Sequence, residues 1–417
     1  MSRSEFCPSL HKWNTEVGSL SNKLNTKFCG VYFKNPIVVA STDIGRTAEG
    51  FERFAKTGVG GIITKSVTDA APLQNKGITM FDVRNMDETP VGSGTGVPDD
   101  YYFFSRGGAM ISMDAYEATA LQILSIARQY EVIPIASICA SKLENWVTYA
   151  RRFEEMGYPM LELNLGNPHG EAAKDKLGFK ISQETQLCVE IASTVTHAVK
   201  IPVVVKLTPQ VADLSALTQA LEASGVQAVT IMHRYQGLVI DHQTLEPVIG
   251  GYAAIGGPWM KPLSLANVAK VRSATNLSIM GGNGVDTAQD VLDFLLAGAD
   301  LVQVGSSMML KGPSYAARLV QALETAVAAT GRSVGDLTGL VAAKIIPYTA
   351  LAKIAARRAV IDTAVCHSCQ EKPCLERCCY QALSLADGTL THNNDSCSGC
   401  GMCKTVCPKG AVRIEKI

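Results

Sequence analysis

The sequence predicts an α/β protein in two parts, a (β/α)8 barrel followed by a small cysteine-rich domain. Three observations lead to this prediction. Eight short hydrophobic segments alternate with helical segments between residues 37 and 306. Nine of the thirteen cysteines lie between Cys366 and Cys407. The chain has 417 residues, 47% of them hydrophobic, which is enough for more than one domain. We place the barrel in residues 1–350 and the second domain in residues 360–417.

The eight predicted strands are rich in Val and Ile and apolar on both faces, as buried parallel strands are. The segments between them carry apolar residues at the three- and four-residue spacing of amphipathic helices. An open doubly wound sheet is the alternative, but the count of eight and the absence of an early Gly-x-Gly-x-x-Gly favour the barrel. The strands are predicted at residues 37–42, 61–66, 134–139, 160–165, 202–207, 228–233, 277–282 and 301–306, and helices at 116–129, 143–155, 185–196, 214–223 and 287–296.

The composition excludes several classes of partner. Thirty-eight basic residues balance thirty-eight acidic ones, so nothing favours nucleic acid or an anionic membrane surface. No apolar run reaches the ~18 residues of a membrane span. Residues 1–14 are polar and mixed, without the apolar core of a signal peptide. We therefore expect a cytoplasmic protein in a reducing compartment.

Two connections of the predicted barrel are unusually long. Residues 67–112 separate the second and third strands and carry the run Tyr101-Tyr102-Phe103-Phe104. Residues 236–262 follow the sixth strand. Long loops in compact domains are usually lids or binding loops, and a surface excursion or subunit contact is the alternative.

The cysteine-rich segment has the spacing of a bacterial ferredoxin. Its second half is a C-x2-C-x2-C-x3-C-P run that ends in Cys407-Pro408, the pattern of [4Fe–4S] ligands. Its first half has two extra residues before the third cysteine, and Cys379 is left over. We predict a small α+β domain of the bacterial-ferredoxin type with two [4Fe–4S] clusters; a pair of zinc sites is the alternative. Because the fourth cysteine of each run ligates the other cluster, the predicted sets are Cys366, Cys369, Cys374 and Cys407, and Cys378, Cys397, Cys400 and Cys403.

The predicted strand ends carry the candidate site, because function in such barrels lies at the carboxyl ends of the strands. Glycines follow the seventh strand at residues 281–284 and the eighth at Gly305-Ser306, where barrels commonly bind phosphate. Ordinary turn glycines are the alternative. Lys65 and Lys206 end two strands, and a lysine inside a barrel needs an anionic partner. They could face an electron-rich ring and its phosphate chain, unless they are structural lysines that reach solvent.

At this point the sequence resembles a known family. The barrel resembles the FMN-binding barrel of dihydroorotate dehydrogenases. Over nearly its full length the chain is similar to the catalytic subunit of bacterial NAD-dependent dihydropyrimidine dehydrogenases, in which the barrel precedes a domain with two [4Fe–4S] clusters. The matching stretches are Asn35-Pro36-Ile37, Ala40-Ser41, Thr64-Lys65, Asn164-Leu165, Pro168-His169-Gly170, Lys206-Leu207-Thr208-Pro209, Lys261-Pro262, Gly281-Gly282 and the double cysteine run.

The resemblance implies a role for each matching position. Lys206 would stabilise negative charge on the reduced flavin. The implied flavin and ribityl contacts are Ala40, Ser41, Lys65, Asn164 and Lys206, those beside the ring are Gly256 and Gly257, and those to the FMN phosphate are Gly281, Gly282, Gly305 and Ser306.

The sequence departs from the family where substrate is handled. The family's catalytic loop reads Asn-Leu-Ser-Cys-Pro and its cysteine is the acid or base, whereas here Asn164-Leu165-Gly166-Asn167-Pro168 places an asparagine at that position. A ring-binding asparagine after the sixth strand is replaced in Met232-His233-Arg234, and a second is not found in residues 107–110. His233, His169 or a tyrosine of the long loop could supply the proton. Arg234 indicates an anionic group on the substrate, or else a surface salt bridge.

These observations together predict an FMN- and iron–sulfur-dependent oxidoreductase that acts on a carbon–carbon bond of a small unsaturated, pyrimidine-like substrate. Reductive removal of a substituent, an electron-transfer subunit without substrate turnover, and a zinc-bearing binding barrel are the alternatives. The chain has no NAD or FAD fingerprint. We therefore expect a separate FAD- and NAD(P)H-oxidising subunit, or a ferredoxin-type donor, and a homo- or hetero-oligomer.

Overall fold

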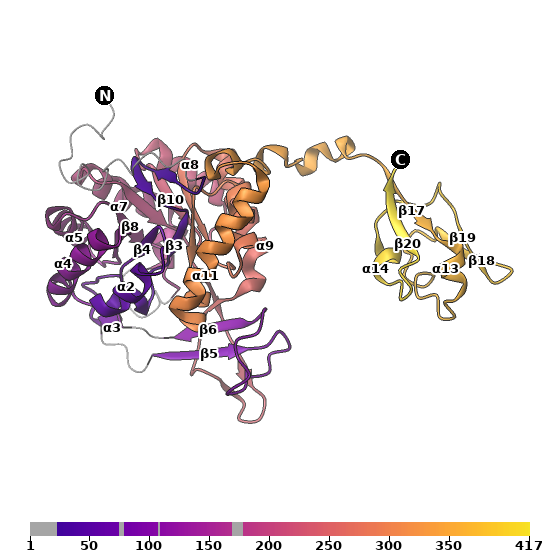
Figure 1. The fold of residues 1–417 in the computed structure, drawn as a ribbon, viewed down its shortest axis with the longest axis horizontal. Helices are drawn as coiled ribbons and strands as arrows, with labels where there is room; N and C mark the ends of the chain where they lie inside the picture. The colour runs from indigo at the N-terminus through magenta and orange to yellow at the C-terminus, as the bar shows by residue number, and fades with distance from the viewer. Residues whose placement is uncertain (1–22, 75–78, 107–108, 169–177) are drawn as a thin grey trace. The chain divides into compact units, whose positions relative to one another are not determined.

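The structure is a computed structural model that describes residues 23–74, 79–106, 109–168 and 178–417. The chain divides into two compact units, one that ends at Ala343 and one that begins at Lys344 (Figure 1). The predicted boundary near residue 360 falls inside the second unit, within the strand Arg357–Ile361. No helix in the described ranges is long and apolar enough to cross a membrane.

The first unit is a closed barrel of eight parallel strands that follow one another in chain order, which confirms the predicted fold. Every predicted strand is present, and four of the eight end two or three residues early, as when the first stops at Val39 rather than residue 42. The residues beyond these ends form the mouth of the barrel. The barrel strands are β3 (Ile37–Val39), β4 (Gly61–Ile63), β7 (Ile133–Ile138), β8 (Leu161–Asn164), β9 (Val203–Lys206), β10 (Ala228–Ile231), β15 (Ser278–Gly282) and β16 (Leu301–Val304).

Helices cover the outside of the barrel and bury its apolar strands (Figure 1). Helix α10 shows why such segments form: Thr287 and Asp290 make a capping box at its start, and Gly298 in the left-handed conformation ends it. Five helices were expected, and α2, α9 and α11 are additional. The longer helices are α2 (Ala48–Ala55), α4 (Met113–Gln129), α5 (Leu143–Met156), α7 (Thr185–Ala198), α8 (Leu214–Ala223), α9 (Lys261–Ala274), α10 (Ala288–Ala297) and α11 (Ser306–Thr330), and the short ones are η2 (Asp43–Arg46), α3 (Ala71–Gln74), α6 (Phe179–Gln183), η4 (Pro258–Met260), α12 (Val334–Leu337), η5 (Ala342–Lys344) and η6 (Tyr348–Lys353).

The two long connections meet in one antiparallel sheet. Strands β5 (Met80–Arg84) and β6 (Tyr102–Arg106) come from the first connection, and β11 (Tyr235–Gly237) and β14 (Ala253–Gly256) from the second. Their order is β11-β14-β6-β5. We call this the covering sheet, because residues of β5 and β6 line the pocket described below. The small hairpins β1 (Thr26–Phe28) with β2 (Val31–Phe33) and β12 (Ile240–Asp241) with β13 (Glu246–Pro247) complete the unit.

The second unit is a small α+β domain. Its outer ribbon pairs β17 (Arg357–Ile361) with β20 (Val412–Lys416), so the two ends of the domain are joined. A second ribbon pairs β18 (Leu383–Ala386) with β19 (Thr389–His392). Two short helices, α13 (Thr363–His367) and α14 (Met402–Thr405), carry cysteines. The buried core consists of Cys366, Cys374, Leu383, Leu390 and Ala411.

Candidate active site and cysteine centres

An open pocket lies at the carboxyl ends of the barrel strands, where the sequence places the site. Its void measures about 870 Å³, including the part open to solvent. The lining includes residues from β5 and β6 as well as from the barrel. Of the predicted site residues, Ala40, Ser41, Lys65, Lys206, His233, Gly305 and Ser306 line the pocket, whereas Asn164, Asn167, Gly256, Gly257, Gly281 and Gly282 lie outside its lining.

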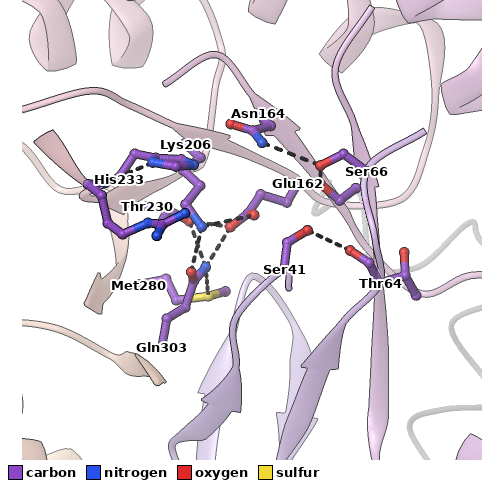
Figure 2. Close-up of polar contacts among 12 residues, drawn as sticks. Ser41, Thr64, Ser66, Glu162, Asn164, Lys206, Thr230, His233, Met280 and Gln303 are labelled. Atoms are coloured by element: carbon purple, nitrogen blue, oxygen red, sulfur yellow. Dashed lines mark hydrogen bonds and ion pairs between the residues drawn. The ribbon is translucent and has the colours of Figure 1, made fainter. Parts of the chain in front are cut away.

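Lys206 belongs to a buried polar network at the bottom of the pocket (Figure 2). Its Nζ donates to Gln303 Oε1 at 2.8 Å and lies 3.5 Å from Glu162 Oε1. Gln303 Nε2 and Thr230 Oγ1 both donate to the other Glu162 oxygen, at 2.5 and 2.8 Å. Burial lowers the pKa of Lys206, and Glu162 opposes this shift. The network thus holds the ammonium group in one place and supplies the anionic partner that a buried lysine requires.

Lys65 has an anionic partner of its own. Its Nζ donates to Asp43 Oδ1 at 2.9 Å, and Asp43 follows the end of β3. Burial lowers the pKa of Lys65 and the Asp43 carboxylate opposes this. Neither lysine is the solvent-reaching structural residue considered as the alternative, since both line the pocket.

Two buried polar atoms near the mouth have no hydrogen-bond partner among the described residues. They are Asn164 Oδ1 and Thr64 Oγ1. The other amide atom of Asn164 donates to Ser66 at 3.3 Å, and Ser41 donates to the Thr64 carbonyl at 2.7 Å (Figure 2). A buried acceptor without a donor is costly, so a ligand that donates a hydrogen bond fits here. A flavin ring carries such a group, and the pocket-lining Ser41, Lys65 and Lys206 adjoin Thr64 and Asn164, so the residues present fit FMN.

The start of α11 suits the phosphate of such a cofactor. The helix begins at Ser306 after Gly305, and no side chain caps its first turn. Its free backbone N–H groups therefore lie at the pocket edge, where they can bind an anion. Close packing explains why two other predicted site positions are glycine. A Cβ on Gly281 would lie 2.6 Å from Phe294, and one on Gly257 would lie 2.0 Å from the Tyr101 carbonyl oxygen.

The structure narrows the candidates for the proton donor. His233 lines the pocket, and its Nδ1 accepts a hydrogen bond from the Arg234 backbone N–H at 2.8 Å. In the neutral ring the proton must therefore be on Nε2. His169 lies outside the described residues. Among the described lining residues there is no tyrosine, and Tyr101 instead contacts Ser307 at 3.2 Å.

Asn167 lies outside the pocket lining, whereas Arg234 lines the pocket. Asn167, at the position of the family's cysteine, is buried and packs against Gly178. Arg234 is no surface salt bridge: its guanidinium lines the pocket and donates to Ser105 at 2.7 Å. Pocket residues that were missed are Asp43, Phe81, Ser105 and Gln303. Gln303 and Glu162 could have been noticed, because each interrupts an apolar strand with a polar side chain.

In the second unit the cysteines fall into two groups. Cys378, Cys397, Cys400 and Cys403 line one pocket of about 350 Å³. Burial raises the pKa of Cys366, and the neighbouring thiols of Cys369 and Cys407 add to this effect. Burial also raises the pKa of the Cys374 thiol, and the neighbouring thiols of Cys366, Cys407 and Cys403 add to this effect. The two ligand sets expected from the crossed cysteine runs stay a prediction.

Cysteine thiols are ligands of both zinc ions and iron–sulfur clusters. Among the residues that the structure describes, no three His, Cys, Asp or Glu side chains converge on one metal-ion position. The void lined by Cys378, Cys397, Cys400 and Cys403 measures about 350 Å³, including the part open to solvent.

The fold and the two sites define the class of barrel oxidoreductases with an iron–sulfur domain. The chain belongs to the family described as dihydroorotate dehydrogenase, whose match spans residues 23–327. Residues 390–413 match the family described as 4Fe-4S binding domain. This second match contains Cys397, Cys400, Cys403 and Cys407, and the first cysteine run precedes it.

Curated relatives carry the name dihydroorotate dehydrogenase B (NAD(+)), catalytic subunit. The protein of Methanothermobacter thermautotrophicus is 29% identical over 320 residues, which cover 76% of this chain and 98% of the relative. Those of Listeria monocytogenes and Pyrococcus furiosus are 28% and 29% identical, and each match covers 75% of this chain and 96% of the relative. About a quarter of this chain therefore has no counterpart in these matches.

Proposed function

We propose that this protein is an FMN- and iron–sulfur-dependent oxidoreductase that adds hydrogen to, or removes it from, a carbon–carbon bond of a small unsaturated, pyrimidine-like compound. The observation that carries the proposal is the pocket at the barrel mouth, into which Lys65, Lys206 and Arg234 bring positive charge. Such a pocket suits a flavin with its phosphate and a substrate on which charge develops. The subunit names of the three curated relatives support the same reaction class.

The residues of the pocket divide the work. FMN, when bound, supplies hydride transfer to or from a substrate carbon. Ser41 would contact the flavin ring, with Asn164 just outside the pocket lining, and Gly305 and Ser306 would hold the phosphate. Lys206 is held by Gln303 and Glu162, so it stabilises negative charge without moving during the reaction. The covering sheet excludes water from one side of the pocket through Phe81 and Phe103.

We assign proton transfer to His233. His233 lines the pocket, and because its Nδ1 accepts a hydrogen bond from the Arg234 backbone N–H, the neutral ring carries its proton on Nε2. The usual cysteine is absent, because Asn167 stands at its position, and an asparagine does not titrate near neutral pH. His233→Gln keeps a polar side chain and removes the titrating ring. It should strongly lower the rate of turnover and leave FMN content unchanged.

The second domain would pass electrons one at a time between the flavin and a partner. Its eight grouped cysteines support two [4Fe–4S] clusters, one in each ligand set. The name of the curated relatives, catalytic subunit of an NAD+ enzyme, supports a separate subunit or ferredoxin-type donor at the other end of this path.

A second candidate reaction is the reductive removal of a halogen or sulfur substituent. The observation that favours it is again Asn167, because such a reaction can dispense with a cysteine acid on that side of the ring. Analysis of the products separates the two reactions: hydrogenation returns one saturated product, whereas removal releases the substituent as an anion.

The test is an anaerobic absorbance spectrum with iron, sulfide and flavin quantified in the purified protein. The proposal requires about eight irons and one FMN per chain, on the ligand count of two [4Fe–4S] clusters. A colourless protein that contains zinc would overturn it. Iron without flavin, even after FMN is added, would instead indicate an electron-transfer subunit that does not turn over substrate.

A further inference from the structure

The second unit contains two halves that share one plan. Each half has a strand, then a run of four cysteines, then a second strand. In each half the fourth cysteine accepts a hydrogen bond from the backbone N–H four residues later. Ala382 donates to Cys378 Sγ at 3.4 Å, and Ala411 donates to Cys407 Sγ at 3.3 Å. The two halves can therefore be compared position by position.

The positions that precede each cysteine run are equivalent as well. Asp362 and Asn393 both lie four residues before the first cysteine of their run. Each accepts the backbone N–H groups two and three residues later on its side-chain oxygen. Each also donates its own N–H, at 2.8 Å, to the carbonyl of the alanine of the opposite half. The residues just before them, Ile361 and His392, therefore occupy matching positions at strand ends.

His392 breaks the likeness between the halves. Ile361 is apolar and packs against the buried core of the unit. His392 is partly buried, and its Nε2 is fully buried with no hydrogen-bond partner among the residues that the structure describes. It lines the same void as four predicted cluster ligands, Cys378, Cys397, Cys400 and Cys403. A buried polar atom without a partner is costly, so this one points to a group that the void would hold.

The chemistry of that group decides which role Nε2 can have. The sulfurs of a [4Fe–4S] cluster and of its cysteine ligands accept hydrogen bonds, and such bonds help to set the reduction potential. In the tautomer that carries its proton on Nε2, the imidazole is a donor for these sulfurs. Cysteine sulfur at this void already accepts one N–H group, since the Gly399 backbone donates to Cys397 Sγ at 3.4 Å. An orphaned imidazole N–H therefore fits an iron–sulfur cluster.

We propose that His392 raises the reduction potential of the cluster in this void, because its Nε2 donates a hydrogen bond to a sulfur of that cluster or of its ligands. The inference rests on the proposed function for the presence of two clusters, and it adds that they differ in potential. Reduction adds one electron to a cluster and breaks no covalent bond, so a nearby N–H donor stabilises the charge gained. Ile361, at the matching position, has no side-chain donor. An electron in this domain therefore resides preferentially on the cluster beside His392.

The test is a redox titration of the holoprotein at a single pH, with dithionite as the reductant and electron paramagnetic resonance as the readout. His392→Ile introduces the residue of the other half, whereas His392→Gln keeps a side-chain N–H. The matched control is His367→Ile. His367 is the other histidine of the second unit; it directly follows Cys366 but is exposed. Iron content is measured for each variant.

We expect reduction of one cluster to become about tenfold less favourable in His392→Ile, which is a midpoint about 59 mV lower for one electron. The other midpoint and the iron content should not change, and His392→Gln should keep both midpoints. The inference is overturned if His392→Ile leaves both midpoints in place, or if His392→Gln lowers one as far as His392→Ile does. It is also overturned if His367→Ile lowers the same midpoint, or if folded His392→Ile loses iron.

A measurement on the wild type tests the inference even if the variants do not fold. Pulsed electron paramagnetic resonance of the reduced protein, with nitrogen-15 in its histidines, should detect a histidine nitrogen coupled to a cluster. The absence of any such coupling would overturn the inference. Failure of the proposed function is a separate result, because it is seen as a wild-type protein that lacks iron before any titration begins.

Discussion

Removal of one partner from the buried ion pair between Lys206 and Glu162 should strongly destabilise the barrel. Both side chains are buried, with 7% and 0% of their surface exposed, and their charged atoms are 3.5 Å apart. At an effective dielectric constant of ~20 this separation corresponds to an attraction of about 5 kcal/mol. Lys206→Met leaves the carboxylate of Glu162 with only Gln303 and Thr230, so we expect a loss of about 3–5 kcal/mol in the free energy of unfolding.

A double-mutant cycle measures this coupling. Lys206→Met, Glu162→Gln and the double variant are unfolded in urea, and tryptophan fluorescence is followed, since all three tryptophans lie before Ala343 and report on the first unit. The double variant should be more stable than the sum of the single losses predicts, by about 2–4 kcal/mol. Single effects that add to within about 0.5 kcal/mol would refute the reasoning, because they would mean that the two charges do not sense each other.

Three further predictions follow from the structure. Burial lowers the pKa of Lys65 from its ordinary 10.5, so at alkaline pH the unfolded chain binds more protons than the folded chain. The free energy of unfolding of the wild type should therefore rise, relative to that of Lys65→Met, between neutral pH and pH 10. A difference in urea midpoints that does not change with pH would contradict this prediction. Cys407→Ala should lower the iron content from about eight to about four per chain and leave one cluster signal in electron paramagnetic resonance, whereas Cys379→Ala should keep all the iron. Gly257→Ala places a Cβ 2.0 Å from the Tyr101 carbonyl oxygen at a residue with φ 129°, so it should lower the free energy of unfolding by about 2–4 kcal/mol, measured by thermal unfolding. Gly312→Ala is the control: its φ is also positive, at 73°, but its Cβ would meet open space, so the loss should be smaller.

Much of the architecture is readable from local patterns. A strand buried on both faces must be apolar throughout, so β3, β9 and the other barrel strands stand out as Val- and Ile-rich segments. The ligand spacing of an iron–sulfur site is likewise a local property, because three of the four cysteines of each set lie within a few residues of one another. Lys65 and Lys206 were identified for the same reason: a charged residue at the end of an apolar strand is conspicuous in the sequence.

Other features depend on which distant segments meet. The covering sheet pairs Phe104 with Ile255, and the second unit pairs its first strand with its last, Ala359 with Ile414. Nothing in either segment names its partner, because β-pairing is set by the path of the chain and by register rather than by composition. For the same reason the network around Lys206 could not be foreseen, since its members come from four strands. The hydrogen bond of Arg234 to the Ser105 hydroxyl became visible when the covering sheet brought Ser105 beside it.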